Sequence, residues 1–260
     1  MSCSAVRLGA IIGALCVSWT PGCYLAHERE LDAAIDVRSR DMGVVASTPL
    51  VWVLVHPTNA PLGPGLFLFD EARQAIIRRL PLPDGVTSPH ALAWDGRSLW
   101  LGGVDAEPGI REIDPADGRV LSRWAFAVTE GIAIDGDTLW YAAVISTLIP
   151  LVHVAGDGTT LESITLPEVT VQDLVMADGA LYYLVDDDAD RIMRFDPATR
   201  SSTELVRNVD VAPYSLGFDG AHLAVAVDGR IRRYDPSTGA LESDRPFAVP
   251  GWITAIAFVR

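Results

Sequence analysis

The stretch "ALAWDGRSLWLGG", Ala91 to Gly103, decides the fold, because a close variant, "GIAIDGDTLWYAA", follows at Gly131 to Ala143. Each copy contains a short apolar run, an Asp-Gly pair, two polar residues and a second apolar run that begins with Leu-Trp. Asp-Gly between two apolar runs is a strong hairpin signal, since tight hairpin turns need positive φ. Each copy therefore predicts two antiparallel strands joined by a tight turn.

The same pattern recurs through the chain as a repeat of about 40 residues. Asp-Gly pairs stand at 95–96, 135–136, 178–179 and 219–220. A second turn signal follows three of them: "IDPADG" at 113–118, "FDPATR" at 195–200 and "YDPSTG" at 234–239. In such turns Asp bonds its own backbone, Pro fixes φ and Gly adopts the left-handed conformation. A repeat of this length with four strands predicts the blades of a β-propeller.

The ends of the repeat region predict the number of blades. The region opens with only three strands, "LVWVLVH", "GLFLFD" and "QAIIRRLPL", and closes with a lone first strand, "WITAIAFVR". Two incomplete units make one blade if the C-terminal strand pairs with the first. We therefore predict an all-β, five-bladed propeller of four-stranded antiparallel blades over 49–260, which leaves few open sheet edges. The aromatic residues of the repeat are expected to pack between blades: Trp52, Trp100, Trp140 and Tyr182.

Residues 1–22 have the features of an export signal. Arg7 precedes an apolar run, Leu8 to Trp19, that is shorter than the ~20 apolar residues that span a bilayer. Cleavage before Cys23 would make that cysteine the N-terminal residue, which resembles a bacterial lipoprotein; ordinary cleavage near Ala26 is the alternative. We expect a lipid anchor at Cys23, a charged tether over 23–48, and a place in the bacterial cell envelope, either periplasmic or anchored to the outer membrane.

The charge of the chain excludes one class of partner. The 260 residues include 20 basic and 34 acidic side chains, for a net charge of −14. Binding to a phosphate backbone needs a basic surface. We therefore expect no nucleic-acid partner, and contact with a membrane only through the N-terminal lipid.

The two faces of the predicted ring differ in how strongly the repeat is kept. Strand direction alternates, so the Asp-Gly and Asp-Pro turns lie on one face and the starts of the first strands on the other, the variable face. The residue five positions before each Asp-Gly pair differs between units, and "TAIAF" matches "HALAW" at the same point. These residues are His90, Glu130, Asp173, Tyr214 and Thr254. Because first strands are innermost in a propeller, we expect these side chains to surround the mouth of the central channel.

The chemistry of this ring allows more than one interpretation. Imidazole and carboxylate groups bind small ligands or a divalent cation. His90, Glu130 and Asp173 could also act as acid and base if burial shifts their pKa values. A water-filled mouth that simply favours polar side chains is the alternative. Trp252 is either an exposed stacking surface at this mouth or a core residue.

Three loops should share the variable face, around His56, near Asp105 and at Asp186–Asp190. The acidic run Asp186–Asp190 lacks the spacing of a calcium loop, so it favours a solvated hairpin over a cation site. The sequence contains no nucleophile elbow, phosphate-binding loop, dinucleotide fingerprint or zinc motif.

The chain resembles one enzyme family over about 88–240. "TEGIAIDGDTLW" is similar to the third blade of plant-type glutaminyl cyclotransferases, and "PYSLGFDGAHLAVAVDGRIRRYDPSTGAL" to their last blade. The resemblance implies a five-bladed propeller that acts on N-terminal glutamine, and only Glu130 carries over residue for residue. This chain has "WLGG" where the family has Tyr-Glu-Ser, and "PYSL" where it has Asn-Glu-Leu-Glu.

Three functions follow. The first is an exported, lipid-anchored propeller that binds a small ligand, a cation, a peptide or a protein on its variable face through His90, Glu130, Asp173, Tyr214, Trp252 and Thr254. The second is a cyclotransferase-like enzyme with Glu130, His90 and Asp173 as acid and base. The third is an envelope scaffold without a small-molecule site. Fold analogy alone does not decide between them.

Overall fold

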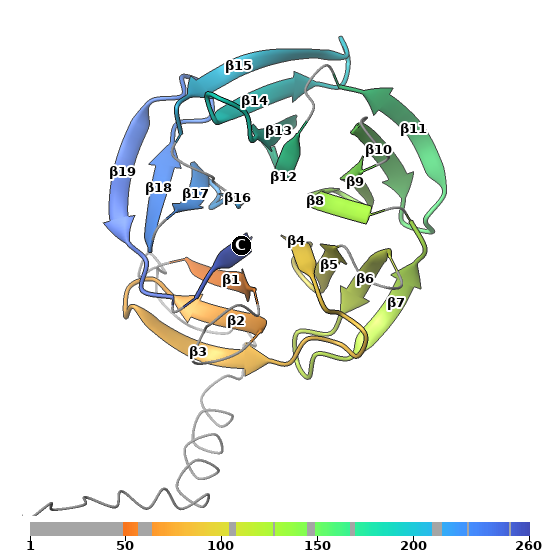
Figure 1. Ribbon diagram of the computed structural model, residues 1–260, viewed down its shortest axis with the longest axis vertical. Helices are drawn as coiled ribbons and strands as arrows, with labels where there is room; N and C mark the ends of the chain where they lie inside the picture. The colour runs from red at the N-terminus through yellow and green to blue at the C-terminus, as the bar shows by residue number, and fades with distance from the viewer. Residues whose placement is uncertain are drawn as a thin grey trace, which may run out of the picture. The chain divides into compact units, whose positions relative to one another are not determined.

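The computed structural model describes residues 49–56, 64–103, 108–126, 128–144, 149–166, 170–209, 215–227, 229–249 and 251–260. Cys23, the tether, Asp105 and Tyr214 lie outside these ranges. The described strands form five four-stranded sheets arranged in a ring (Figure 1). The predicted five-bladed propeller is therefore confirmed.

Each blade lists its strands from the channel outward. The first contains β20 (Ile253–Val259), β1 (Leu50–Val55), β2 (Gly65–Asp70) and β3 (Ala75–Leu80). The second contains β4 (Pro89–Trp94), β5 (Leu99–Gly103), β6 (Ile110–Ile113) and β7 (Val120–Trp124). The third contains β8 (Val128–Asp135), β9 (Thr138–Val144), β10 (Pro150–Ala155) and β11 (Thr160–Thr165). The fourth contains β12 (Val171–Ala177), β13 (Ala180–Val185), β14 (Arg191–Asp196) and β15 (Ser201–Arg207). The fifth contains β16 (Leu216–Phe218), β17 (Leu223–Val227), β18 (Arg230–Tyr234) and β19 (Leu241–Pro246).

The hydrophobic core lies between neighbouring blades. The second strands are buried on both faces, and every residue of β13 is buried, because each lies between two adjacent sheets. The outer strands alternate between exposed and half-buried residues, as in β11. One core cluster joins Trp140 and Leu151 of the third blade to Leu174 and Tyr183 of the fourth. Continuous apolar runs therefore mark the inner strands, as expected for strands covered on both faces.

The C-terminal strand closes the first blade. β20 pairs antiparallel with β1, with Val51 opposite Phe258, and the C-terminus lies near the centre of the ring (Figure 1). The backbone N–H of His56 donates to the carbonyl of Trp252 at 2.9 Å, just beyond this pairing. The two incomplete units of the sequence thus form one blade, as predicted.

The repeated turns have the chemistry that their sequences predict. In the last Asp-Pro turn, the Asp235 carboxylate accepts hydrogen bonds from the hydroxyl groups and backbone N–H groups of Ser237 and Thr238. These bonds lower the pKa of Asp235 to about 2, because they stabilise the ionised form. Gly239 follows with φ +72, and a Cβ there would lie 2.3 Å from the carbonyl oxygen of Leu205, so only glycine fits.

Three of the four aromatic residues of the repeat are buried as predicted: Trp52, Trp140 and Tyr182. Trp100 is the exception, because its side chain is only half-buried. No helix long and apolar enough to span a membrane occurs in the described parts of the chain.

Candidate functional site

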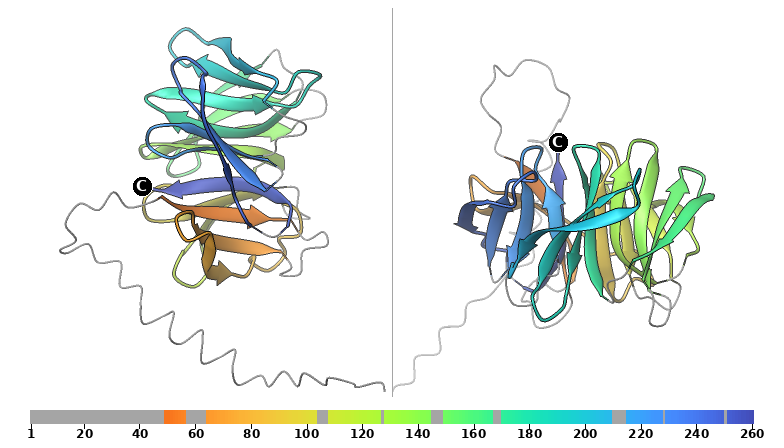
Figure 2. Two further views of the ribbon diagram at one scale, coloured as in Figure 1. Left: turned by 90° about the vertical axis from the view of Figure 1, so that its left-hand side faces the viewer. Right: turned by 90° about the horizontal axis from the view of Figure 1, so that it is seen from above.

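The inner strands bulge where they begin, at the mouth of the channel on the variable face. In β4, Pro89 pairs with Gly103 and Ala91 with Gly102, which leaves His90 as the extra residue. Glu130 is the extra residue of β8 and Thr254 that of β20. A bulge turns one side chain away from the regular alternation of the strand. The strands run roughly along the axis of the ring (Figure 2), so these residues share one end of the channel.

In the fourth blade, the extra residue is Gln172 and not Asp173. Val171 pairs with Val185 and Asp173 with Leu184, so the bulge falls one residue earlier than the sequence pattern predicts. The cause is the turn that follows. In the third blade Asp135 still pairs with Thr138, whereas in the fourth blade Asp178 and Gly179 are themselves the two turn residues, with φ of 49° and 75°.

Asp173 therefore occupies the position of Ala91 and Ala255, which are also buried. Its side chain has no exposure, and its two carboxylate oxygens accept hydrogen bonds from the backbone N–H groups of Leu174 and Leu216, each at 2.8 Å. Burial raises the pKa of Asp173 well above its ordinary value, against the effect of the two hydrogen bonds. The contact with Leu216 joins the fourth blade to the fifth, so Asp173 connects blades.

His90 and Glu130 form a pair across two blades at the mouth. The Nδ1 atom of His90 lies 3.4 Å from Oε2 of Glu130, and its Nε2 atom lies 3.1 Å from the Ser88 hydroxyl. The side chains of His90 and Glu130 are 30% and 20% exposed, so both can be reached from solvent. Burial raises the pKa of Glu130, because its carboxylate has lost much of its hydration.

Two further rings extend this pair over the surface. The His56 ring lies 6.4 Å from that of His90 and 6.0 Å from that of Trp252, centroid to centroid. Burial, and then the nearby charge of His90, lower the pKa of His56. Trp252 is 49% exposed, which settles the alternatives for this residue in favour of an exposed surface beside the mouth. His56, predicted only as part of a loop on this face, is in direct contact with the ring residues.

The remaining residues of the mouth have structural partners. The Gln172 amide donates to Asp186 Oδ2 at 3.0 Å, which joins the mouth to the acidic run. Within that run the Asp187 carboxylate accepts from the Arg191 guanidinium, in agreement with a hairpin. Thr254 is buried, and its hydroxyl contacts the carbonyls of Leu54 at 3.5 Å and Pro89 at 3.4 Å. Thr254 thus connects the first and second blades.

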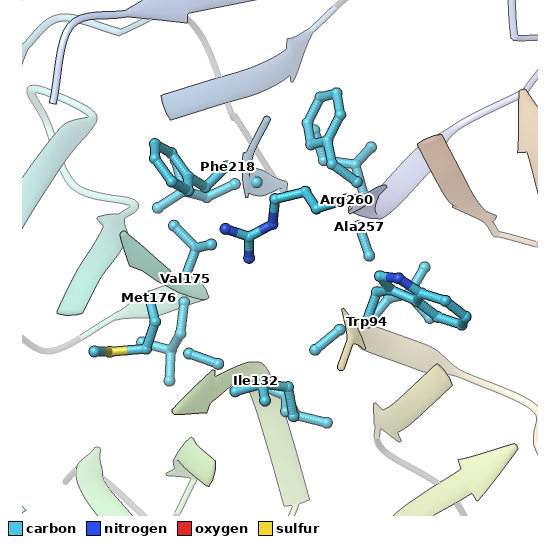
Figure 3. Close-up of a pocket in the computed structure, with 16 residues that line it drawn as sticks. Trp94, Ile132, Val175, Met176, Phe218, Ala257 and Arg260 are labelled. Carbon is cyan, nitrogen blue, oxygen red and sulfur yellow. The ribbon is translucent and has the colours of Figure 1, made fainter. Parts of the chain in front are cut away.

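The opposite end of the channel is nearly filled. A cavity of about 30 Å³ lies between the five inner strands where they reach the Asp-Gly turns. A space of this size holds a water molecule or two. Figure 3 shows the Arg260 side chain extending across the centre of this ring of apolar residues, and its guanidinium carbon lies 5.2 Å from the centroid of Phe218. A ligand on the axis would therefore have to enter from the His90 end.

The geometry gives a cation site no support. Among the residues that the structure describes, no group of three or more His, Cys, Asp or Glu side chains could hold a metal ion. His90 and Glu130 approach each other, but Asp173 uses both oxygens on backbone N–H groups.

Comparison with known proteins extends the fold and not the function. No family model matches the chain, and no curated protein matches it. A crystal structure of a nidogen/laminin complex aligns with 82% of this chain and 98% of that chain, with a TM-score of 0.53 and 14% identity. The extracellular domain of a hybrid two component system from B. thetaiotaomicron aligns with 80% of this chain and 29% of its own, with a TM-score of 0.44 and 18% identity. At 14% identity the first likeness concerns the fold alone. The chain is thus a five-bladed β-propeller.

Proposed function

We propose that this propeller is a binding protein that takes up a small molecule or the end of a peptide at the His90 end of its channel. The observation that carries the proposal is the state of Glu130. Its carboxylate is 20% exposed and contacts His90 at 3.4 Å, and burial raises its pKa. A carboxylate that has lost hydration without compensating short hydrogen bonds gains free energy when a ligand supplies a donor.

The surroundings of Glu130 define the ligand further. Trp252 offers a half-exposed ring for stacking, and His56 lies between this ring and His90. Aromatic surface beside a few convergent polar groups is typical of small-molecule sites. We therefore expect a ligand that combines a flat or apolar part, placed on Trp252, with an N–H or O–H donor directed at Glu130.

A thermal-shift screen of the full-length protein with small metabolites and short peptides tests this proposal. Compounds that stabilise the parent should lose their effect in Glu130→Gln and in Trp252→Ala. Asp117→Asn, at an exposed Asp-Pro turn, is the matched control and should keep every response. The proposal fails if both mouth variants respond to every compound as the parent does.

A second candidate function is supported by the pair His90 and Glu130. A glutamate with a raised pKa beside an imidazole can transfer protons near neutral pH. The resemblance to glutaminyl cyclotransferases carries over Glu130, whereas the buried position of Asp173 removes it from the proposed acid–base set. Incubation with a peptide that begins with glutamine, followed by mass spectrometry, tests this activity: a loss of ammonia that Glu130→Gln abolishes would favour the enzyme over the binding protein.

We also propose that the chain is exported and anchored to the bacterial envelope through a lipid on Cys23. The support is the order of Arg7, the apolar run and the cysteine in the first 23 residues. Fractionation and mass spectrometry of Cys23→Ala against the parent test the anchor. An unchanged mass and an unchanged membrane fraction would contradict it and favour ordinary cleavage near Ala26.

A further inference from the structure

A second concave site lies on the opposite face, between the second and third blades. It is a groove of about 220 Å³ at the edge of the ring, away from the central channel. Two aromatic residues and four polar ones carry the argument: Asp95, Trp100, Glu112, Trp124, Asp137 and Thr138. The groove is smaller than the roughly 300–1,000 Å³ of sites for drug-sized ligands, so it suits a small molecule or a single side chain.

The groove is open because one ring of the repeat is missing here. In the third blade Trp140 pairs with His153, and the two rings stack at 4.2 Å with an angle of 7° between their planes. In the second blade the equivalent Trp100 pairs with Glu112. A carboxylate does not cover the indole as an imidazole does, which leaves Trp100 half-buried while Trp140 is 1% exposed.

Trp100 and Trp124 form two walls of the groove. Their ring centroids lie 4.9 Å apart, with 46° between the planes. The Trp100 indole N–H donates to Asp95 Oδ2 at 2.7 Å, which fixes the orientation of the ring. The backbone of Gly158 lies against Trp124, since a Cβ there would be 3.5 Å from the indole. Both rings are therefore held in place before any ligand binds.

The polar part of the groove carries negative charge alone. Asp95, Glu112 and Asp137 line it, and no described lysine, arginine or histidine does. Glu112 is held by the hydroxyl groups of Ser98 at 2.8 Å and Ser122 at 2.9 Å, which donate to its two oxygens. Neutral donors orient the carboxylate without cancelling its charge.

The groove between the fifth and first blades shows that this charge is particular to one site. That groove is lined by three carboxylates and three basic side chains: Glu71, Asp219, Glu242, His222, Arg233 and Arg245. Arg233 bonds both Glu71 and Asp219 there. The same place in the ring is thus balanced in charge at one blade junction and wholly acidic at the other.

We propose that the groove between the second and third blades binds the ammonium group of a small organic cation, with Trp100 and Trp124 facing the cation and Glu112 supplying the countercharge. Rings of tryptophan attract cations through their negative faces, and quaternary ammonium groups are the ligands that aromatic cages select. Nearby carboxylates add a Coulombic attraction. The site is independent of the proposed ligand at the His90 end, so either proposal can fail alone.

Choline and 3,3-dimethylbutan-1-ol are the probes, because they have nearly the same shape and only choline is charged. Titration of the full-length protein, followed by calorimetry and tryptophan fluorescence, should show choline binding at least about tenfold more tightly than the neutral alcohol. A peptide with trimethyl-lysine, compared with choline, distinguishes a protein side chain from a free metabolite as the source of the ammonium group.

Variants assign the binding to this groove. Glu112→Gln and Trp124→Leu should each weaken choline binding about tenfold or more, whereas Glu242→Gln in the balanced groove should leave it unchanged. Glu112→Gln keeps the size of the side chain, so the test remains valid if Trp124→Leu does not fold. Equal affinity for choline and the alcohol, no binding of either cationic probe, or full affinity in Glu112→Gln would each overturn the proposal.

Discussion

The carboxylate of Asp173 accepts a hydrogen bond from the backbone N–H of Leu216, 2.8 Å away in the next blade, while its other oxygen accepts one from Leu174. An asparagine could accept only one of these bonds and would direct its own N–H₂ group at the other donor. We expect Asp173→Asn to lower the free energy of unfolding by about 1–3 kcal/mol, because a buried donor loses its partner.

Urea unfolding of Asp173→Asn against Glu130→Gln measures this difference. The Glu130 side chain reaches solvent and makes no short hydrogen bond of its own, so Glu130→Gln should stay within about 0.5 kcal/mol of the parent. Equal stability of parent and Asp173→Asn would contradict the connection between the blades.

The pKa of Glu130 has a consequence for stability against pH. Burial raises this pKa above the ordinary 4.5, so the folded protein still holds a proton where the unfolded chain has lost it. The contribution of Glu130 to stability therefore falls as pH rises above about 4.5, through the raised pKa. Glu130→Gln should become more stable relative to the parent over this window, measured by urea unfolding between about pH 4 and pH 8. A difference that is constant with pH would show that the burial of Glu130 is without effect.

Arg233 joins the fifth blade to the first through a buried ion network. Its side chain is 10% exposed, and those of Glu71 and Asp219, which it bonds, are each 8% exposed. Arg233→Ala should cost about 3–5 kcal/mol of stability, because it leaves two carboxylates without their cation in a dry environment. The matched control is Arg73→Ala, whose partner is Asp70 and whose side chain is 78% exposed; it should cost less than about 1 kcal/mol. Thermal or urea unfolding compares the two, and similar losses would show that the network is not desolvated.

Removal of residues 252–260 should unfold the whole propeller. The first blade would lose its inner strand, and the apolar cluster that β20 shares with the first and fifth blades would be exposed. Circular dichroism of the shortened protein should show loss of the cooperative transition. A melting temperature like that of the parent would contradict the closure.

The fold was predictable because its signals are local and repeated. Asp-Gly and Asp-Pro pairs mark turns by their own backbone preferences, and four copies fix the period. The site was less so. An alignment on Asp-Gly pairs assumes that the pair takes one place in every turn, and in the fourth blade the turn residues are Asp178 and Gly179 themselves. The register, and with it the exchange of Asp173 for Gln172, is a property of strand pairing that the pattern does not contain.

The groove beside Trp100 illustrates the other limit. In the sequence Trp100 and Trp140 are equivalent, and both were predicted to be buried between blades. Their difference arises on the neighbouring strand, where Glu112 stands opposite one and His153 opposite the other. A comparison of units position by position through the third strand contains this signal, which the turn pairs hide.

The pairing of β20 with β1 has a consequence for the order in which the protein is made. The partner of β1 emerges about 200 residues after it, which at typical rates of synthesis of about 5–20 residues per second is a delay of roughly 10–40 s. During this time β1 has an open hydrogen-bonding edge beside apolar side chains, and such edges pair with other chains. A protein of this topology therefore depends on holding its first blade apart from its neighbours until translation has delivered the strand that covers it.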